Sequence, residues 1–302
     1  MEINDDLAEI ILDFKCNSHC IFCYERRNRY FPAKTTVELK KEIKAARQKG
    51  FSRLSLIGGE PTIRPDIFEL INFAKIAGFD YIMIATNGRM FNYTNFAYQM
   101  VRSGISEVIF SLHGYQAKIH DSHTGSLGGF KQLKNGIANL KRLGFDNVGI
   151  NVVVVQQNYC YLPRIAKLLL KWRIRRVHFI YGSVLENFKQ LTPKISKVAP
   201  YLCEALEMGK QEGYFWRILN APMSCYFKDY LDRLSWSITQ KSHLFIRTAK
   251  ARLIHQAGEK LRKIWVWVKL SKCRFCNYQK ECPGIWREYL KQYGDGEVKP
   301  VK

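Results

Sequence analysis

The chain has 302 residues, of which 47% are hydrophobic and 13% aromatic, so it can fill one large core or two modest ones. This composition excludes an intrinsically disordered protein. No apolar run approaches the roughly eighteen residues that a membrane-spanning helix needs. The first six residues also lack the pattern of a signal peptide. We therefore expect a cytoplasmic protein with no membrane partner.

Lys and Arg number 48 against 26 Asp and Glu, which gives a net charge of +22 and favours attraction to polyanions. Part of this charge lies in a basic tract, residues 233–272, in which aromatic residues are interleaved. Basic residues hold phosphates and aromatic rings stack on bases, so RNA is a candidate partner. The alternative is that the charges occupy solvated helix faces. The residues concerned are Lys241, Arg247, Lys250, Arg252, Lys260, Arg262, Lys263, Trp236, Phe245, Trp265 and Trp267.

Predicted strands and helices alternate along the first two thirds of the chain. Residue 35 or 36 is a plausible N-cap for the first helix, and several helices end at a glycine, a residue that suits the C′ position. The predicted strands are residues 8–14, 53–57, 81–85, 107–112, 148–155 and 177–180. The helices between and after them are predicted up to residues 49, 77, 102, 143 and 172.

Six strand–helix units of this kind predict a parallel α/β architecture. Six units are two short of a closed eight-stranded barrel, which suits a partial (β/α)6 barrel. Polar and glycine motifs follow the strands directly, and parallel sheets build their sites at those ends. One more helix is predicted at 195–211. Residues from about 213 to 270 are irregular and basic, and they end in an alternating strand at 264–270.

Three cysteines, Cys16, Cys20 and Cys23, form a C-x3-C-x2-C array directly after the first predicted strand. Three thiolates at this density suit an iron–sulfur cluster and leave one iron of a four-iron cluster without a protein ligand. A structural zinc site normally takes four ligands, and His19 is too close in the chain to supply the fourth without strain. The spacing therefore favours a cluster with an open iron.

Four more cysteines make a second set near the C-terminus. Cys273, Cys276 and Cys282 are spaced C-x2-C-x5-C, and Cys225 lies upstream. Four thiolates suit a second [4Fe–4S] cluster or a structural zinc ion, and the spacing does not decide between them. Cys160 and Cys203 belong to neither set, and we expect both to be inert core thiols.

The first cysteine array, with Phe22 just before its last cysteine, resembles the signature of the radical S-adenosylmethionine (SAM) superfamily. A second element of that family follows the second strand, at Gly58–Pro61. The resemblance implies that the three cysteines hold a [4Fe–4S] cluster whose fourth iron is chelated by SAM. It also implies reductive cleavage of SAM to methionine and a 5′-deoxyadenosyl radical, a partial (β/α)6 barrel, and a reductant such as ferredoxin or flavodoxin.

Several residues are implied as SAM contacts by the same resemblance. The segment Gly58, Gly59, Glu60 and Pro61 would contact the SAM amino group, with Glu60 as an acceptor for the ammonium. The composition of this segment also fits an ordinary turn. The other expected contacts are Phe22, Thr86, Ser111 and Asn151. We further expect His113 at the barrel mouth near the substrate, and His120 and His123 on a solvated loop.

The C-terminal cysteines and the Pro283–Trp286 segment after them are similar to the SPASM or shorter twitch extensions of the same superfamily. This resemblance implies an auxiliary [4Fe–4S] cluster held by Cys273, Cys276 and Cys282, with Cys225 as the fourth ligand. We therefore predict a radical SAM core at 1–212 and a twitch-like region at 213–302.

Three functions follow as hypotheses. The first is hydrogen abstraction from a substrate, which in the SPASM and twitch group is often a peptide or protein and in some relatives a small molecule such as a nucleotide. The second is modification of tRNA or other RNA. The third is a metal-bound scaffold or electron carrier, which would hold clusters without cleaving SAM.

Overall fold

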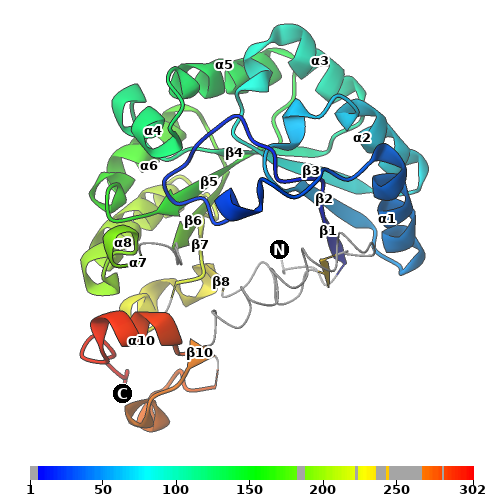
Figure 1. Cartoon of the computed structure of the whole chain (residues 1–302). Coiled ribbons are helices and arrows are strands. Elements are labelled where there is room, and N and C mark those ends of the chain that lie inside the picture. The colour runs from blue at the N-terminus through cyan, green and yellow to red at the C-terminus, as the bar shows by residue number, and fades with distance from the viewer. Residues whose placement is uncertain (1–5, 182–187, 222–223, 236–242, 245–266, 281) are drawn as a thin grey trace.

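The computed structural model describes residues 6–181, 188–221, 224–235, 243–244, 267–280 and 282–302. Within these segments, nine parallel strands form one curved sheet in the order β8-β7-β6-β5-β4-β3-β2-β1-β9. The helices cover the outer face of the sheet (Figure 1). The strands are β1 (Leu7–Ile11), β2 (Arg53–Ile57), β3 (Tyr81–Thr86), β4 (Glu107–Ser111), β5 (Val148–Val154), β6 (Arg176–Tyr181), β7 (Arg217–Leu219), β8 (Leu234–Ser235) and β9 (His243–Leu244).

The helices that the sequence signals predicted end within one residue of the expected positions. Thr35 caps the first helix in a full capping box with Glu38. The helix predicted at 195–211 has those bounds in the structure. The helices in chain order are α1 (Thr36–Gln48), α2 (Ile67–Ile76), α3 (Thr94–Arg102), α4 (Ala117–Thr124), α5 (Gly129–Arg142), α6 (Leu162–Lys171), α7 (Phe188–Leu191) and α8 (Ile195–Gln211).

The partial-barrel prediction is confirmed, and the sheet extends beyond the six predicted strands. β7 and β8 lie in the stretch that the sequence indicated as irregular. They have only three and two residues, which is too short for a period of two to be recognised. α4 was also not predicted, because it has eight residues and no side-chain cap at its N-terminus.

The C-terminal residues pack against the barrel. β10 (Trp267–Val268) pairs antiparallel with β11 (Ile285–Trp286), and α10 (Arg287–Tyr293) follows. The predicted strand at 264–270 is thus described only in part, since 264–266 lie outside the described residues. The Trp286 ring is fully buried and its centroid is 5.4 Å from that of Tyr181 at the end of β6. One hydrophobic core therefore includes residues from both sides of the predicted boundary at 212/213.

Among the helices of the described segments, none combines the length and the apolar character that a membrane crossing requires.

Candidate cofactor site

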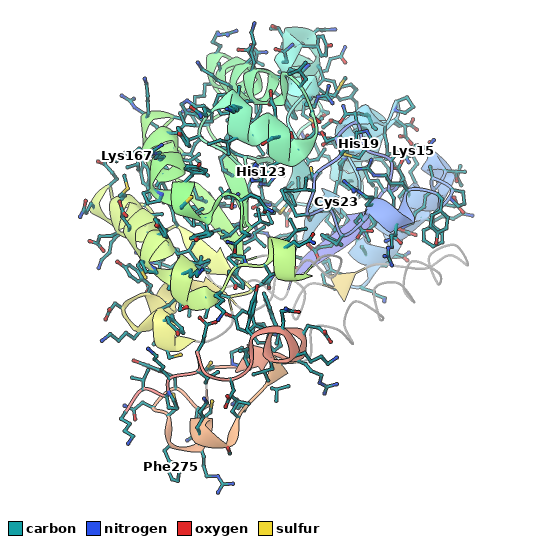
Figure 2. All side chains as sticks on the ribbon, turned by 60° about the vertical axis from the view of Figure 1, so that its left-hand side comes forward. Lys15, His19, Cys23, His123, Lys167 and Phe275 are labelled. Atoms are coloured by element: carbon teal, nitrogen blue, oxygen red, sulfur yellow. The ribbon has the colours of Figure 1, made fainter. Side chains whose placement is uncertain are left out.

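The first cysteine array lies on the loop between β1 and the short helix η1 (Arg26–Asn28). Figure 2 shows His19 and Cys23 on this loop and His123 on α4. The end of α4 holds the loop through two backbone bonds, from His19 N to Thr124 O (2.8 Å) and from Ile21 N to His123 O (2.9 Å). Because both acceptors are carbonyls at the C-terminal end of a helix, they have no intrahelical partner and are available for the loop.

The thiols of the loop are partly buried. Burial, together with the neighbouring Cys23 and Cys16 thiols, raises the pKa of Cys20 to about 12. Burial also raises the pKa of Cys16, while the backbone N–H of Ser18, 3.4 Å from its Sγ, opposes that rise. The raised pKa values of Cys16 and Cys20 oppose ionisation in the absence of a bound cation, and metal binding supplies that cation because the thiolate, not the thiol, is the metal ligand.

The donor set fits a cluster better than a single ion. Within the described segments, no three His, Cys, Asp or Glu side chains converge as ligands of one metal ion. A four-iron cluster binds each thiolate at a different iron, so its cysteines need not converge on one point. The set also holds only soft sulfur donors, which iron–sulfur clusters prefer.

Gly58 and Gly59 follow β2 and touch the chain that leads into the cysteine loop. A Cβ on Gly58 would lie 2.3 Å from the Asp13 carbonyl oxygen, and one on Gly59 would lie 2.1 Å from that of Lys15. Backbone bonds join the same segments, from Gly59 N to Asp13 O (2.8 Å) and from Glu60 N to Lys15 O (2.7 Å). Only glycine permits this approach. The contact between the turn after β2 and the chain that leads into the cysteine loop is therefore enough to require glycine at both positions.

Glu60 is buried, with 2% of its surface exposed, and its carboxylate joins the ends of β2 and β3. Oε1 accepts from Thr62 N (3.1 Å), Thr62 Oγ1 (2.5 Å) and Thr86 Oγ1 (2.6 Å), and Oε2 accepts from Asn87 N (2.6 Å). Burial raises the pKa of Glu60, and these hydrogen bonds oppose the rise. Four donors match the roughly four lone-pair sites of a carboxylate. In this structure Glu60 and Thr86 therefore support the strand ends, and a contact of either with SAM stays a prediction.

Asn87 was missed as a site residue, although it follows Thr86 directly at the end of β3. Its Nδ2 donates to Asn17 Oδ1 (2.7 Å) and Ser18 Oγ (3.1 Å), and lies 4.0 Å from Cys16 Sγ. The signal available in the sequence was an amide side chain next to a glycine at a strand end. Asn87 links β3 to the cysteine loop, so Glu60, Asn87 and the loop form one hydrogen-bonded unit.

Phe22 packs into the wall of the site and is 8% exposed. Its ring lies edge-on to His113, with centroids 4.5 Å apart. Burial holds the pKa of His113 well below its usual range, and its Nδ1 accepts from Val153 N (3.2 Å). The neutral His113 ring and the Phe22 ring thus close one side of the loop.

The expectation that His120 and His123 lie on a solvated loop is wrong. Both lie in α4 and are only 2% and 4% exposed. His120 Nδ1 accepts from His113 N (3.2 Å), and His123 Nδ1 lies 2.5 Å from Ile119 O. The short helix that the sequence did not reveal carries them inward, and they brace the site. Cys160, expected in the core, is exposed.

Ser111 and Asn151 are brought together at the inner face of the sheet. They are register partners on β4 and β5, and Asn151 is in turn the partner of His178 on β6. His178 Nδ1 lies 3.1 Å from Asn151 Oδ1. Burial lowers the pKa of His178 to about 4, with Arg176 and Arg217 adding to the effect. His178 was not predicted, because a histidine within a strand has no distinguishing signal.

All four cysteines of the second set line one cavity in the C-terminal region. Cys225, Cys273, Cys276 and Cys282 share it with apolar residues and with Lys299. Gly284 N donates to Cys282 Sγ (3.4 Å). Burial raises the pKa of Cys225, and nearby Cys282 and Cys276 contribute to the rise. In the sequence, the long separation of Cys225 from the other three cysteines was weak evidence that the four form one site. The fold places all four around one cavity.

Comparison with known proteins gives a family match. The model of the radical SAM superfamily matches residues 10–169. A probable GTP 3′,8-cyclase from Saccharolobus solfataricus is 28% identical over 174 residues, 57% of this chain and 55% of that protein. A GTP 3′,8-cyclase from a Cyanothece species is 31% identical over 189 residues, 58% and 56% of the two chains. The alignments thus span about half the length of these relatives.

Solved structures resemble a larger part of the chain. The structure of anSMEcpe with bound AdoMet has a TM-score of 0.66 at 16% identity and covers 98% of this chain and 93% of that one. SuiB from Streptococcus suis bound to S-adenosylmethionine has a TM-score of 0.64 at 18% identity, covering 95% and 74%. Each of these two has also been solved with a peptide. At these identities the similarity establishes the fold.

The Glu60 network gives a direct stability prediction. Glu60→Gln places an amide NH2 where one of the carboxylate oxygens accepts, so at least one buried donor loses its acceptor. We expect the free energy of unfolding at pH 7 to fall by about 2 kcal/mol, measured by urea denaturation. Glu69→Gln is the control, because Glu69 forms an exposed pair with Lys40, and its effect should stay within about 0.5 kcal/mol. Equal stabilities for the two variants would contradict this role of Glu60.

Proposed function

Because the chain belongs to the radical SAM superfamily, we propose that Cys16, Cys20 and Cys23 hold its [4Fe–4S] cluster and that the enzyme abstracts hydrogen from a peptide or protein. When bound, the cluster and SAM supply a 5′-deoxyadenosyl radical, which takes the hydrogen atom. The observation that carries the assignment is the unit formed by the cysteine loop, Gly58–Gly59 and the Glu60–Asn87 bonds.

The residues around the loop would bind and shield the reactants. Three thiolates leave one iron without a protein ligand, which is where SAM binds in this proposal. Phe22 and His113 exclude water from one side of the loop, because both are buried and neutral. Ser111, Asn151 and His178 form a polar row on the inner face of the sheet, next to where a substrate in the barrel would lie.

The C-terminal set is proposed as the ligands of an auxiliary [4Fe–4S] cluster in a twitch-like region at 213–302. The support is the shared cavity of Cys225, Cys273, Cys276 and Cys282, whose lining contains no carboxylate or imidazole. Four thiolates would saturate the cluster. Their number also suits a structural zinc ion, although the four do not converge on one point in this structure, so the metal content decides between these two.

Peptide or protein modification is favoured over nucleotide chemistry by the extent of the similarity. The likeness to anSMEcpe and SuiB, each also solved with a peptide, covers 98% and 95% of this chain. The alignments with the GTP 3′,8-cyclases span 57–58% of this chain. RNA modification remains the alternative that the charge suggests. Its evidence is the basic tract. Of the side chains named for that tract, only Trp267 lies within the described residues.

The auxiliary cluster predicts a metal count. After anaerobic reconstitution, we expect about eight irons per chain in the wild type and about four when Cys273 and Cys276 are both replaced by alanine. Cys160→Ala is the matched control, because Cys160 is exposed and belongs to neither set, and it should keep all eight. About four irons together with one zinc in the wild type would contradict the second cluster and indicate a zinc site.

The substrate class can be tested through the destination of the abstracted atom. Peptide, nucleotide and RNA fractions from cells grown in deuterated medium would each be incubated with the reduced protein and unlabelled SAM. We expect deuterium in 5′-deoxyadenosine, measured by mass spectrometry, from the peptide fraction. Label from the nucleotide fraction alone would favour chemistry like that of the named cyclases, and label from RNA alone would favour the RNA alternative. Either result would overturn the peptide proposal.

A further inference from the structure

Three arginines contact the backbone of the cysteine loop at four consecutive carbonyls. Arg89 Nη1 donates to Asn17 O, and Arg29 Nη2 donates to Ser18 O (2.5 Å). Arg26 Nη2 donates to both His19 O and Cys20 O (3.1 Å each). The arginines come from different places, two from η1 and its C-cap and one from the residue after Gly88. We call these three residues the arginine clamp.

The clamp fixes whole peptide groups, because a trans peptide is planar and its C=O and N–H point in opposite directions. The peptide group between Asn17 and Ser18 accepts from Arg89 at its C=O, and its N–H, on Ser18, donates to Cys16 Sγ (3.4 Å). The peptide group between Ser18 and His19 accepts from Arg29 at its C=O, and its N–H, on His19, donates to Thr124 O (2.8 Å). The peptide held at Cys20 O by Arg26 donates from Ile21 N to His123 O. Three of the loop's peptide groups are therefore held at both ends.

The clamp also brings positive charge to the thiols. Arg29 bonds to the carbonyl of Ser18, which lies between Cys16 and Cys20 in the chain, so its guanidinium group lies beside the segment that joins these two cysteines. Its Nε is buried and has no hydrogen-bond partner among the described residues. The three guanidinium groups thus place positive charge along the loop from Asn17 to Cys20.

We propose that Arg26, Arg29 and Arg89 are positioning residues that hold the cysteine loop ready for its cluster and raise the reduction potential of that cluster. One-electron reduction by an external reductant adds a negative charge to the cluster. Nearby cations, and N–H groups aimed at the sulfurs, stabilise the more negative state. The inference depends on the proposed assignment of Cys16, Cys20 and Cys23 as cluster ligands.

The test is a redox titration of the reconstituted protein without SAM, followed by electron paramagnetic resonance of the reduced cluster. Arg29→Gln removes one positive charge and should make reduction about tenfold less favourable, which is 59 mV for one electron. Arg29→Lys keeps the charge and should restore most of the wild-type potential. Arg102→Gln, an exposed residue in the last turn of α3, makes the same change in net charge away from the loop and should leave the potential unchanged.

The outcomes separate this inference from the proposed function. If Arg29→Gln binds a full cluster at an unchanged potential, the inference is overturned and the proposed function is unaffected. If Arg29→Gln does not bind iron, Arg26→Gln carries the same test, because Arg26 is exposed and its loss removes fewer buried contacts. An unchanged potential in Arg26→Gln would then overturn the inference. A wild-type protein that binds no cluster at Cys16, Cys20 and Cys23 overturns the proposed function as well.

Discussion

The buried carboxylate of Glu60 is the interaction on which the site depends. It receives bonds from Thr62, Thr86 and Asn87, and so fixes the ends of β2 and β3 relative to each other. Asn87 then extends the network to Asn17 and Ser18 in the cysteine loop. A carboxylate without these donors would be costly to bury. With them, the ends of two strands and the loop after a third move as one body, so the thiols keep their places before any cluster arrives.

Gly58 and Gly59 make this arrangement possible, and the arginines of the clamp balance the negative charge of the thiolates and of Glu60. Gly58 and Gly59 allow the β2 turn to lie against the carbonyls of Asp13 and Lys15 at distances that exclude a side chain. The thiolates and Glu60 would otherwise gather negative charge in a partly buried place, where electrostatic effects are stronger than in water. The guanidinium groups around the loop offset that charge while they hold its carbonyls. Much of the chain's positive charge lies elsewhere, but part of it has this local use.

The sequence predicted the features that have a fixed period or spacing. Long buried strands, glycine-terminated helices and the two tight cysteine trios could be recognised because each obeys a rule that involves only near neighbours. Cys225 is distant in sequence from its trio, and only the fold brings it to the same cavity. β7, β8 and α4 could not, since short elements are stabilised by packing that the sequence does not display. The inward position of His120 and His123 followed from α4 and was missed with it. Asn87 and His178 act through contacts with distant residues, and such contacts only become visible in the fold.

The central claim is that the loop of Cys16, Cys20 and Cys23 is the place where SAM is cleaved. The most direct measurement is the amount of 5′-deoxyadenosine that the reconstituted, reduced protein forms from SAM alone, compared with Cys20→Ala and Cys282→Ala. Our account predicts its formation in the wild type, its loss in Cys20→Ala and its persistence in Cys282→Ala, because only the first set leaves an open iron. Absence of 5′-deoxyadenosine from the fully loaded wild type under any reductant, or its persistence in Cys20→Ala, would contradict the account.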